Sequence, residues 1–315
     1  MQFINIKQLS DALVSRNQIL QKLELLVNAK DYIRVEPDYF EPYERFIQMN
    51  KRIKKETMVK IINQDGSLAI LRPDVTTNLI KQIIPKWSDQ DSLKVYYIAS
   101  TFSQLPMQTV LETKQFGVEY LGDADVSDQK VIELIVSIFK SFKMDFILEI
   151  SNQSFLNALI EDLSISEDAQ ETLKSIIDYK NQEELLGFIK NNSLTDDQAK
   201  LLSNLFKLQG DLETIINDLK PFKLNQKMSD AIAHLIKLKN NLEKHDLLRL
   251  TTFDLSLISK FDYYDGVTFK GYLKGVSFPV LSGGRYDLLT KEFGKKVPAT
   301  GFSLDLSEFI KEASK

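Results

Sequence analysis

The sequences FDYYDG at residues 261–266 and SGGRYD at residues 282–287 decide how the rest of the chain is interpreted. Each segment places small residues beside tyrosines and carboxylates. Residues 267–269 and 276–281 between them are rich in β-branched and aromatic side chains, with Lys270-Gly271 as the candidate turn. This pattern predicts a β-hairpin flanked by the two segments.

The same two segments are a candidate ligand site. Gly283 and Gly284 permit positive φ and let a ligand approach the backbone closely, so we expect a turn there. Tyrosine hydroxyls and carboxylates beside such a turn suit a small polar ligand that carries an amine or an imidazole. A well-packed hairpin with aromatic core residues explains the pattern equally well, and these segments alone do not decide between the two.

Composition limits the class of protein. The 315 residues are enough for about two domains, and a hydrophobic content of 43% with 27% charged residues is ordinary for a globular chain. We see no apolar run long enough for a membrane span and no signal-peptide pattern, which predicts a cytoplasmic protein with no membrane partner. The net charge of −4 argues against nucleic-acid binding.

Metal and thiol chemistry find little support. The chain has no cysteine, which excludes disulfides and thiolate metal ligands. Its two histidines, His234 and His245, lie in a charged helical stretch, where we expect them to be solvated rather than catalytic. No phosphate-binding glycine loop or nucleophile–base pattern is visible. The sequence therefore predicts no metal, no cofactor and no catalytic residue of these kinds.

Periodicity divides the chain into two kinds of structure. Helical stripes at 5–30 and 128–142, with strands between and after them, indicate an α+β core made of residues 1–152 and 248–315. Residues 153–247 have only helical periodicity, with N-cap signals at Ser164, Ser166 and Thr195, and predict an all-helical insertion. The predicted strands of the core before the C-terminal hairpin are residues 32–36, 58–62, 68–71, 95–99, 114–119, 145–150 and 250–255.

Two further groups of polar residues stand at element ends or on one strand face. Asp74 and Thr76 fall where a strand gives way to a helix, so Asp74 is either a helix cap or a carboxylate that receives a ligand's amine. In a strand, Gln115, Gly117 and Glu119 share one face. Two polar side chains around a glycine on one face of a sheet suggest the floor of a ligand site.

Five motifs together resemble a known family. They are LRPDVTT at 71–77, QFGVE at 115–119, FDYYDG, SGGRYD, and ATGFS at 299–303. In this order they resemble the catalytic core of class II histidyl-tRNA synthetases, and more closely that family's non-synthetase branch, the regulatory subunits of ATP phosphoribosyltransferase. The resemblance implies an antiparallel sheet of six or seven strands flanked by helices. It also implies a homodimer whose interface includes the first helix and the region of Pro37.

Three departures from the synthetase pattern bear on activity. Arginines that stabilise charge at the ATP α-phosphate are replaced, by our alignment, with Ser103, Ser259 and Glu308, and Leu105 stands for a glutamate. Losing one such stabiliser typically costs about 3 kcal/mol, so we expect no useful adenylation. The sequence ends at Lys315 without the anticodon-binding domain of the synthetases, so we expect no tRNA partner.

What remains of the motifs is similar to the amino-acid half of a synthetase site. By resemblance, Asp74 and Thr76 would face the α-amino group of a histidine ligand, and the other residues of the motifs would line its side-chain pocket. An inherited pocket that no longer binds anything is the alternative. The residues implied are Asp74, Thr76, Gln115, Glu119, Tyr263, Tyr264 and Tyr286.

The resemblance implies a non-catalytic regulatory subunit in the first step of histidine biosynthesis. Such a subunit would be needed for activity of a short-form catalytic subunit within a hetero-octamer-like assembly and would confer feedback inhibition by L-histidine. Whether histidine binds this pocket or a subunit interface stays open. Two rivals remain: a free-standing amino-acid-activating ligase, and a binding module that acts on another partner through its helical insertion.

Overall fold

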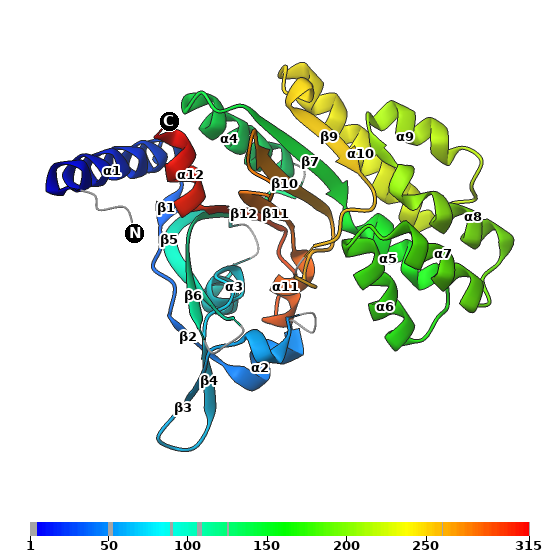
Figure 1. Ribbon diagram of the computed structural model, residues 1–315, viewed down its shortest axis with the longest axis horizontal. Coiled ribbons are helices and arrows are strands. Elements are labelled where there is room, and N and C mark those ends of the chain that lie inside the picture. The colour runs from blue at the N-terminus through cyan, green and yellow to red at the C-terminus, as the bar shows by residue number, and fades with distance from the viewer. Residues whose placement is uncertain are drawn as a thin grey trace.

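A computed structural model describes residues 5–49, 53–88, 91–105, 109–124, 126–259 and 261–314 of the chain. Over these residues the protein is α+β, as predicted. A large sheet runs through the middle, helix α1 lies at one end of the molecule and the helices α5 to α9 lie at the opposite end (Figure 1).

The following elements lie in the described residues before 153 and after 247. The helices of the core are α1 Ile6–Asn28, α2 Tyr43–Met49, α3 Thr76–Ile83, α4 Ser127–Ser141, α11 Asp287–Glu292 and α12 Leu306–Ala313. Its strands are β1 Ile33–Arg34, β2 Phe40–Pro42, β3 Lys60–Ile62, β4 Leu68–Leu71, β5 Leu93–Gln104, β6 Val110–Leu121, β7 Phe146–Asn152, β9 Thr251–Asp254, β10 Val267–Leu273, β11 Leu281–Arg285 and β12 Ala299–Asp305. Short 3₁₀ turns are η1 Lys55–Thr57, η2 Ile84–Lys86, η4 Leu205–Lys207 and η5 Leu248–Leu250.

The large sheet is mixed rather than wholly antiparallel. Its order in the described chain is β1-β5-β6-β12-β11-β10-β7-β9-β8, and the six strands from β5 to β7 pair antiparallel. Strand β1 joins β5 in parallel and β9 joins β7 in parallel. The six strands of the antiparallel centre agree with the expected six or seven, and the additions at both edges extend it. A separate sheet has the order β2-β4-β3.

The C-terminal hairpin exists, but its turn is not where the sequence suggested. Lys270 and Gly271 lie inside β10, which pairs in register with both β7 and β11. The chain turns instead at residues 274–275, where Gly275 has a φ of +86°. The expected turn at Gly283-Gly284 is also wrong, since both glycines belong to β11. A Cβ on Gly283 would lie 2.2 Å from the Gly301 carbonyl oxygen, so this glycine serves close strand packing.

The two faces of the sheet are covered by different helices. One face is apolar, and side chains such as Phe116, Phe269 and Phe302 share one core with Phe139 of α4 and Phe309 of α12. The other face holds a smaller cluster, in which Ile80 of α3 meets the tyrosines of the two C-terminal motifs. The polar residues singled out from the sequence lie on this second face.

Residues 153–247, all of which the structure describes, are mainly helical as expected. They form α5 Gln153–Asp162, α6 Glu167–Asp178, α7 Gln182–Asn191, α8 Asp196–Asn204, α9 Leu212–Leu219 and α10 Gln226–Lys244. The expectation of a purely helical segment is wrong in one place, because strand β8 Gln209–Gly210 pairs with β9. Ser166 and Thr195 do cap helices, whereas Ser164 adopts a φ of +53° and caps none.

A buried ion pair links strand β11 to helix α4, and helix α10 contacts it. Arg285 of β11 donates to Asp128 of α4 at 3.0–3.1 Å, and Thr300 donates to the same carboxylate at 2.5 Å. His234 of α10 lies 3.3 Å from it with 37% of its side chain exposed, so this part-solvated histidine also has a structural partner that the sequence did not indicate. Burial alone would raise the pKa of Asp128, but the hydrogen bond from His234 and the charge of Arg285 outweigh it, and the pKa is lowered.

Removing this carboxylate should destabilise the fold strongly. In Asp128→Ala the Arg285 guanidinium would keep its burial and lose its main counter-charge, so we expect the free energy of unfolding to fall by about 3–5 kcal/mol in urea denaturation. Asp145→Ala is the matched control, because Asp145 and its partner Lys274 are 78% and 81% exposed. That change should stay within about 0.5 kcal/mol. Equal effects of the two substitutions would contradict the importance of the buried pair.

Candidate functional site

The candidate site sits on the middle strands of the sheet, where register brings β5, β6 and β12 side by side. Glu119 of β6 lies opposite Gly301 of β12, and Gly117 lies opposite Tyr97 of β5. Gln115, Gly117 and Glu119 therefore share one face, as their spacing predicted. The floor of the site is thus formed by paired strands and not by loops.

Glu119 is the centre of the polar contacts. Its carboxylate is fully buried, and it accepts a hydrogen bond from the Thr76 hydroxyl at 2.7 Å and one from the Tyr286 hydroxyl at 2.5 Å. Gly301 makes room for it, since a Cβ there would lie 1.8 Å from the Glu119 Oε2 atom. Three distant stretches of sequence therefore meet at one carboxylate.

Burial dominates the ionisation of Glu119. It raises the pKa of this carboxyl to about 8, although the hydrogen bonds from Tyr286 and Thr76 act in the opposite direction. At neutral pH the neutral acid is therefore the main form. A neutral Glu119 has a proton to donate, so this side chain can recognise a ligand either as donor or as acceptor.

Asp74 binds backbone amides at the start of a helix, which is one of the two roles that the sequence allowed for it. Its carboxylate accepts from the backbone amides of Thr76 and Thr77, at 3.3 Å and 2.8 Å, at the start of α3. It also accepts from the Tyr263 hydroxyl at 3.2 Å. Asp74 therefore ties the start of the helix to the FDYYDG segment, and it lies within the same buried cluster as Glu119.

Aromatic rings close the space above this floor. The Tyr263 ring lies 5.1 Å from Phe261, 4.9 Å from Tyr264 and 6.0 Å from Tyr286 between centroids. The cavity lined by Asp74, Thr76, Gln115, Tyr263, Tyr264 and their neighbours measures about 20 Å³. That is room for roughly one water molecule, so the described conformation is closed around its own side chains.

The structure brings the residues predicted for the site together. Five of them line the cavity, with Gln115 part exposed; Glu119 accepts a hydrogen bond from Thr76 of this lining, and Tyr286 donates to Glu119 from behind it. Sequence reasoning missed Tyr97, which is fully buried beside Glu119 and Asp74. It also missed the spatial role of Gly301. Strand alternation at residues 95–99 could have placed Tyr97 on the face of Gly117, but nothing in the sequence specified that register.

The three residues aligned with the synthetase arginines carry no positive charge. Ser103 is in β5, the Ser259 amide donates to Gln153, and Glu308 of α12 pairs with Lys311 at 2.6 Å. Two arginines are buried among the described residues, and each is already engaged. Arg72 donates to three backbone carbonyls and Arg285 binds Asp128. Neither guanidinium is available to a phosphate.

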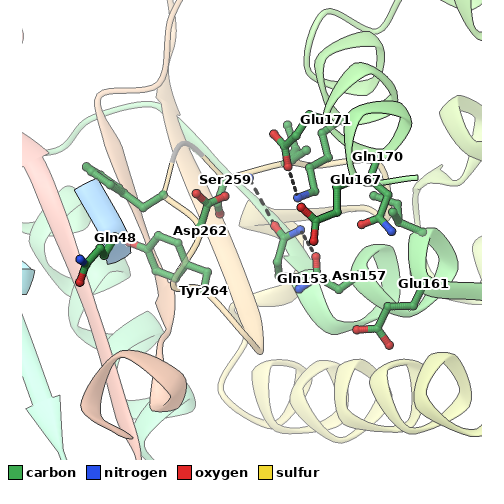
Figure 2. A pocket seen from close by; sticks show the side chains of 14 residues that line it. Gln48, Gln153, Asn157, Glu161, Glu167, Gln170, Glu171, Ser259, Asp262 and Tyr264 are labelled. Atoms are coloured by element: carbon green, nitrogen blue, oxygen red, sulfur yellow. Dashed lines mark hydrogen bonds and ion pairs between the residues drawn. The ribbon is translucent and has the colours of Figure 1, made fainter. Parts of the chain in front are cut away.

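A larger cleft opens beside the closed cavity. It measures about 490 Å³ and lies between helices α5 and α6 on one side and Ser259, Phe261, Asp262 and Tyr264 on the other. Figure 2 shows Tyr264 and Gln48 on one side and Glu161, Glu167 and Glu171 on the other. Phe261 and Tyr264 line both this cleft and the closed cavity, so these rings are the wall between them.

Other kinds of site find no support in the described residues. Their histidines and acidic side chains form no group of three or more that could hold a metal ion. None of their helices combines the length and the apolar character needed to cross a membrane.

The fold and site define a class II synthetase-like protein, and comparisons with known proteins agree. The family model for histidyl-tRNA synthetase matches residues 8–309. The structure of an ATP phosphoribosyltransferase regulatory subunit/histidyl-tRNA synthetase from Bacillus halodurans superposes with a TM-score of 0.85 at 25% identity, covering 99% of this chain and 82% of that one. A histidine–tRNA ligase subunit from Alicyclobacillus acidocaldarius has the same fold, with a TM-score of 0.82 at 21% identity over 100% and 96%.

Comparison with curated relatives shows to which branch of this family the chain belongs. An ATP phosphoribosyltransferase regulatory subunit from Acetivibrio thermocellus is 30% identical over 93% of this chain and 71% of its own length. One from Caldanaerobacter subterraneus is 29% identical over 94% and 78%. The chain belongs to the histidyl-tRNA synthetase family and, within it, to the ATP phosphoribosyltransferase regulatory subunits. This confirms the resemblance and the fold class that the motifs predicted.

The raised pKa of Glu119 predicts how the stability of the fold depends on pH. Because the folded state keeps the proton that the unfolded state releases, stability should fall as pH rises from about 4.5 to 8 and level off above. Glu119→Gln cannot ionise and should remove this component, so the variant gains stability relative to the wild type across that interval, by a few kcal/mol. Urea unfolding at pH 5, 6, 7 and 8 measures it. A constant difference at all four pH values would show that Glu119 does not titrate there.

Proposed function

We propose that this chain is the non-catalytic regulatory subunit of a hetero-oligomeric ATP phosphoribosyltransferase in cytoplasmic histidine biosynthesis. In this proposal a short-form catalytic subunit needs it for activity, and L-histidine inhibits the complex through it. Membership of the regulatory-subunit branch supports the assignment. The observation that carries the histidine part is the buried cluster of Glu119 with Thr76 and Tyr286, a polar site kept inside the core.

The proposal that the chain is not itself an enzyme is supported by the residues at the positions that match the synthetase arginines. Adenylate formation requires permanently charged groups at the α-phosphate. Ser103, Ser259 and Glu308 stand at the aligned positions, and Glu308 brings a negative charge. ATP and phosphoribosyl pyrophosphate would bind the catalytic subunit, with no tRNA or cofactor bound to this chain.

Histidine sensing in this cluster would be a population shift. The cavity of about 20 Å³ is too small for an amino acid, so Tyr263 and Tyr264 would have to move apart for histidine to enter. Asp74 and Thr76 would then receive its α-amino group, while Gln115, Glu119 and Tyr286 would line its side chain. A ligand that binds only the opened form biases the complex toward that form.

We also propose a homodimer within the larger assembly, and a division into a core of residues 1–152 and 248–315 with an insertion at 153–247. Apolar side chains on the first turns of α1 support the dimer. Ile6, Leu9, Leu13 and Val14 are 46–81% exposed, whereas Ile19 and Leu23 further along the helix are buried in the core. An exposed apolar stripe of this kind is typical of an interaction surface.

The functional prediction is made on the complex reconstituted with a short-form catalytic subunit. Phosphoribosyltransferase activity should depend on this chain, and L-histidine should inhibit it. Glu119→Gln should keep the activation and raise the histidine concentration for half inhibition about tenfold, because it changes a hydrogen bond at the ligand. Glu112→Gln, an exposed carboxylate on the same strand, is the control and should change neither.

Two outcomes would contradict this proposal. If histidine inhibits Glu119→Gln as it inhibits the wild type, histidine does not bind the cluster of Glu119 and its neighbouring tyrosines, and a subunit interface is then favoured as its site. Pyrophosphate exchange that needs both histidine and ATP would favour an amino-acid-activating ligase. Thermal melts of the isolated chain with each ligand separate these cases, since a ligand at 100 times its dissociation constant stabilises by about 2.7 kcal/mol.

The dimer has its own prediction. The wild-type chain should sediment as a dimer, and Leu9→Lys combined with Leu13→Lys should shift it toward the monomer, because two charges would be placed in an apolar contact. Leu186→Lys on α7 makes the same chemical change at an exposed leucine far along the chain and should leave the dimer intact. A monomeric wild type would disprove the dimer.

A further inference from the structure

An open pocket lies over strands β10 and β11, beside the closed cavity that Tyr263 and Tyr264 line, here called the tyrosine cavity. The open pocket measures about 350 Å³, within the range of small-molecule sites. Phe261, Tyr264 and Ser282 line both spaces, so the two spaces would join if the aromatic rings moved apart. Lys270 of β10 lines only the open pocket.

The tyrosine cavity offers no positive charge to the carboxylate of an amino acid. In the binding mode proposed above, Asp74 and Thr76 receive the α-amino group of histidine, and its α-carboxylate has no assigned partner. None of the described residues that line the cavity is a lysine, an arginine or a histidine. A carboxylate that is taken out of water beside Asp74 without a cation is costly in free energy. A free amino acid therefore needs a positive charge from just outside this cavity.

Strand register places Lys270 on the face of the sheet that carries the cavity floor. Lys270 lies opposite Ser282 of β11, and Ser282 lies opposite Ser303 of β12. Ser303 lies opposite Gly117 of β6, so this row of residues faces the same side as Glu119. Both serines line the tyrosine cavity, and both have accessible surface. The two serines therefore form a polar path from Lys270 to the floor of the cavity.

The ammonium group of Lys270 can reach this path. Neighbouring strands lie about 4.8 Å apart, so the lysine starts one strand spacing from Ser282. Its flexible stem of about four carbons can carry the ammonium group over the serine, and the open pocket provides the space. A carboxylate bound above Ser282 would meet both the ammonium group and the serine hydroxyl, which are hydrogen-bond donors.

Lys270 is half-buried and has no close counter-charge. The structure gives it no ion pair within 4 Å among the described residues. Burial lowers its pKa, and the charges of Asp178, Glu149 and Asp254 act against this from a greater distance. Glu149 accepts from a tyrosine hydroxyl at 3.3 Å, and Asp254 binds Lys180 at 2.5 Å. A ligand carboxylate would give the Lys270 ammonium group a direct partner and offset the hydration that it has lost.

One position that the resemblance assigns to an arginine borders the same pocket. Ser259, which is aligned with one of the synthetase arginines, lines the open pocket together with Lys270. An arginine at this position would bring a permanent positive charge to this side of the site. Among the described residues that line the pocket, Lys270 is the one with a positive charge. The charge comes from the strand beneath the site, and not from the segment above it.

We propose that Lys270 binds the α-carboxylate of the effector amino acid once the Phe261 and Tyr264 rings have moved, with the Ser282 hydroxyl as a second donor. This inference rests on the proposed function, because it assigns a specificity-determining residue to the histidine site. The ligand's ammonium group stays with Asp74, so the amino acid crosses the boundary between the two spaces. The site then selects a free amino acid over the same compound without its carboxylate.

Isothermal titration calorimetry of the reconstituted complex tests this with L-histidine and with histidinol, in which a hydroxymethyl group replaces the carboxylate. The wild type should bind L-histidine about tenfold more tightly than histidinol. Lys270→Gln should weaken L-histidine about tenfold and leave histidinol unchanged, because only the acid carries the group that the lysine binds. Lys274→Gln, in the exposed turn of the same hairpin, is the matched control and should keep the wild-type preference.

The preference for L-histidine over histidinol is a ratio measured on one preparation, so a partly unfolded sample does not change it. A second variant keeps the test decisive if Lys270→Gln does not fold. Ser282→Ala alters an exposed side chain, should melt like the wild type and should reduce the preference several-fold. The proposal is overturned if the folded Lys270→Gln complex, or the Ser282→Ala complex where Lys270→Gln does not fold, keeps the wild-type preference.

Glu119→Gln separates this proposal from the proposed function. Histidinol and L-histidine share the amine and the imidazole, so Glu119→Gln should weaken both and leave the preference for the acid intact. If L-histidine binds the wild-type complex and Lys270→Gln leaves the preference unchanged, the role of Lys270 is overturned and the proposed function stands. If neither compound binds the wild-type complex at millimolar concentration, both proposals are overturned.

Discussion

The burial of one carboxylate, Glu119, in the middle of the sheet is the constraint on which the site depends. A carboxyl group with no accessible surface has to be hydrogen-bonded, and its partners come from helix α3 and from the residue before α11. Gly301 on the neighbouring strand has to lack a side chain. The positions of two helices and one strand are therefore coupled to the position of a single side chain.

The face of the sheet that carries Glu119 has two cavities, one nearly filled by side chains and one open. Around Glu119 the Tyr263 and Tyr286 hydroxyls donate to Asp74 and Glu119, and the packed rings leave almost no volume. Over β10 and β11 the volume is present. A shared aromatic wall of Phe261 and Tyr264 separates them, so any motion of these rings changes both spaces at once.

Much of this could be predicted from the sequence, for identifiable reasons. The helices and most strands follow from periodicity, and motif residues such as Asp74, Glu119 and Tyr286 were placed in one site by family resemblance. The turn at Lys270-Gly271 was misplaced because a glycine inside a central strand has the same local signal as a glycine in a turn. The mixed edges of the sheet and the contact between His234 and Asp128 depend on tertiary packing, which one strand's pattern does not encode.

The attachment of the helical segment has an evolutionary consequence. It leaves the sheet after β7 and returns at β9, and these two strands are direct neighbours. Helices can therefore be exchanged, lengthened or redecorated between two adjacent anchor points while the antiparallel centre keeps its pairing. Since α6 supplies Asp178 to the wall of the open pocket over β10 and β11, drift in this segment can change the shape of that pocket without touching the sheet that the chain shares with its synthetase relatives.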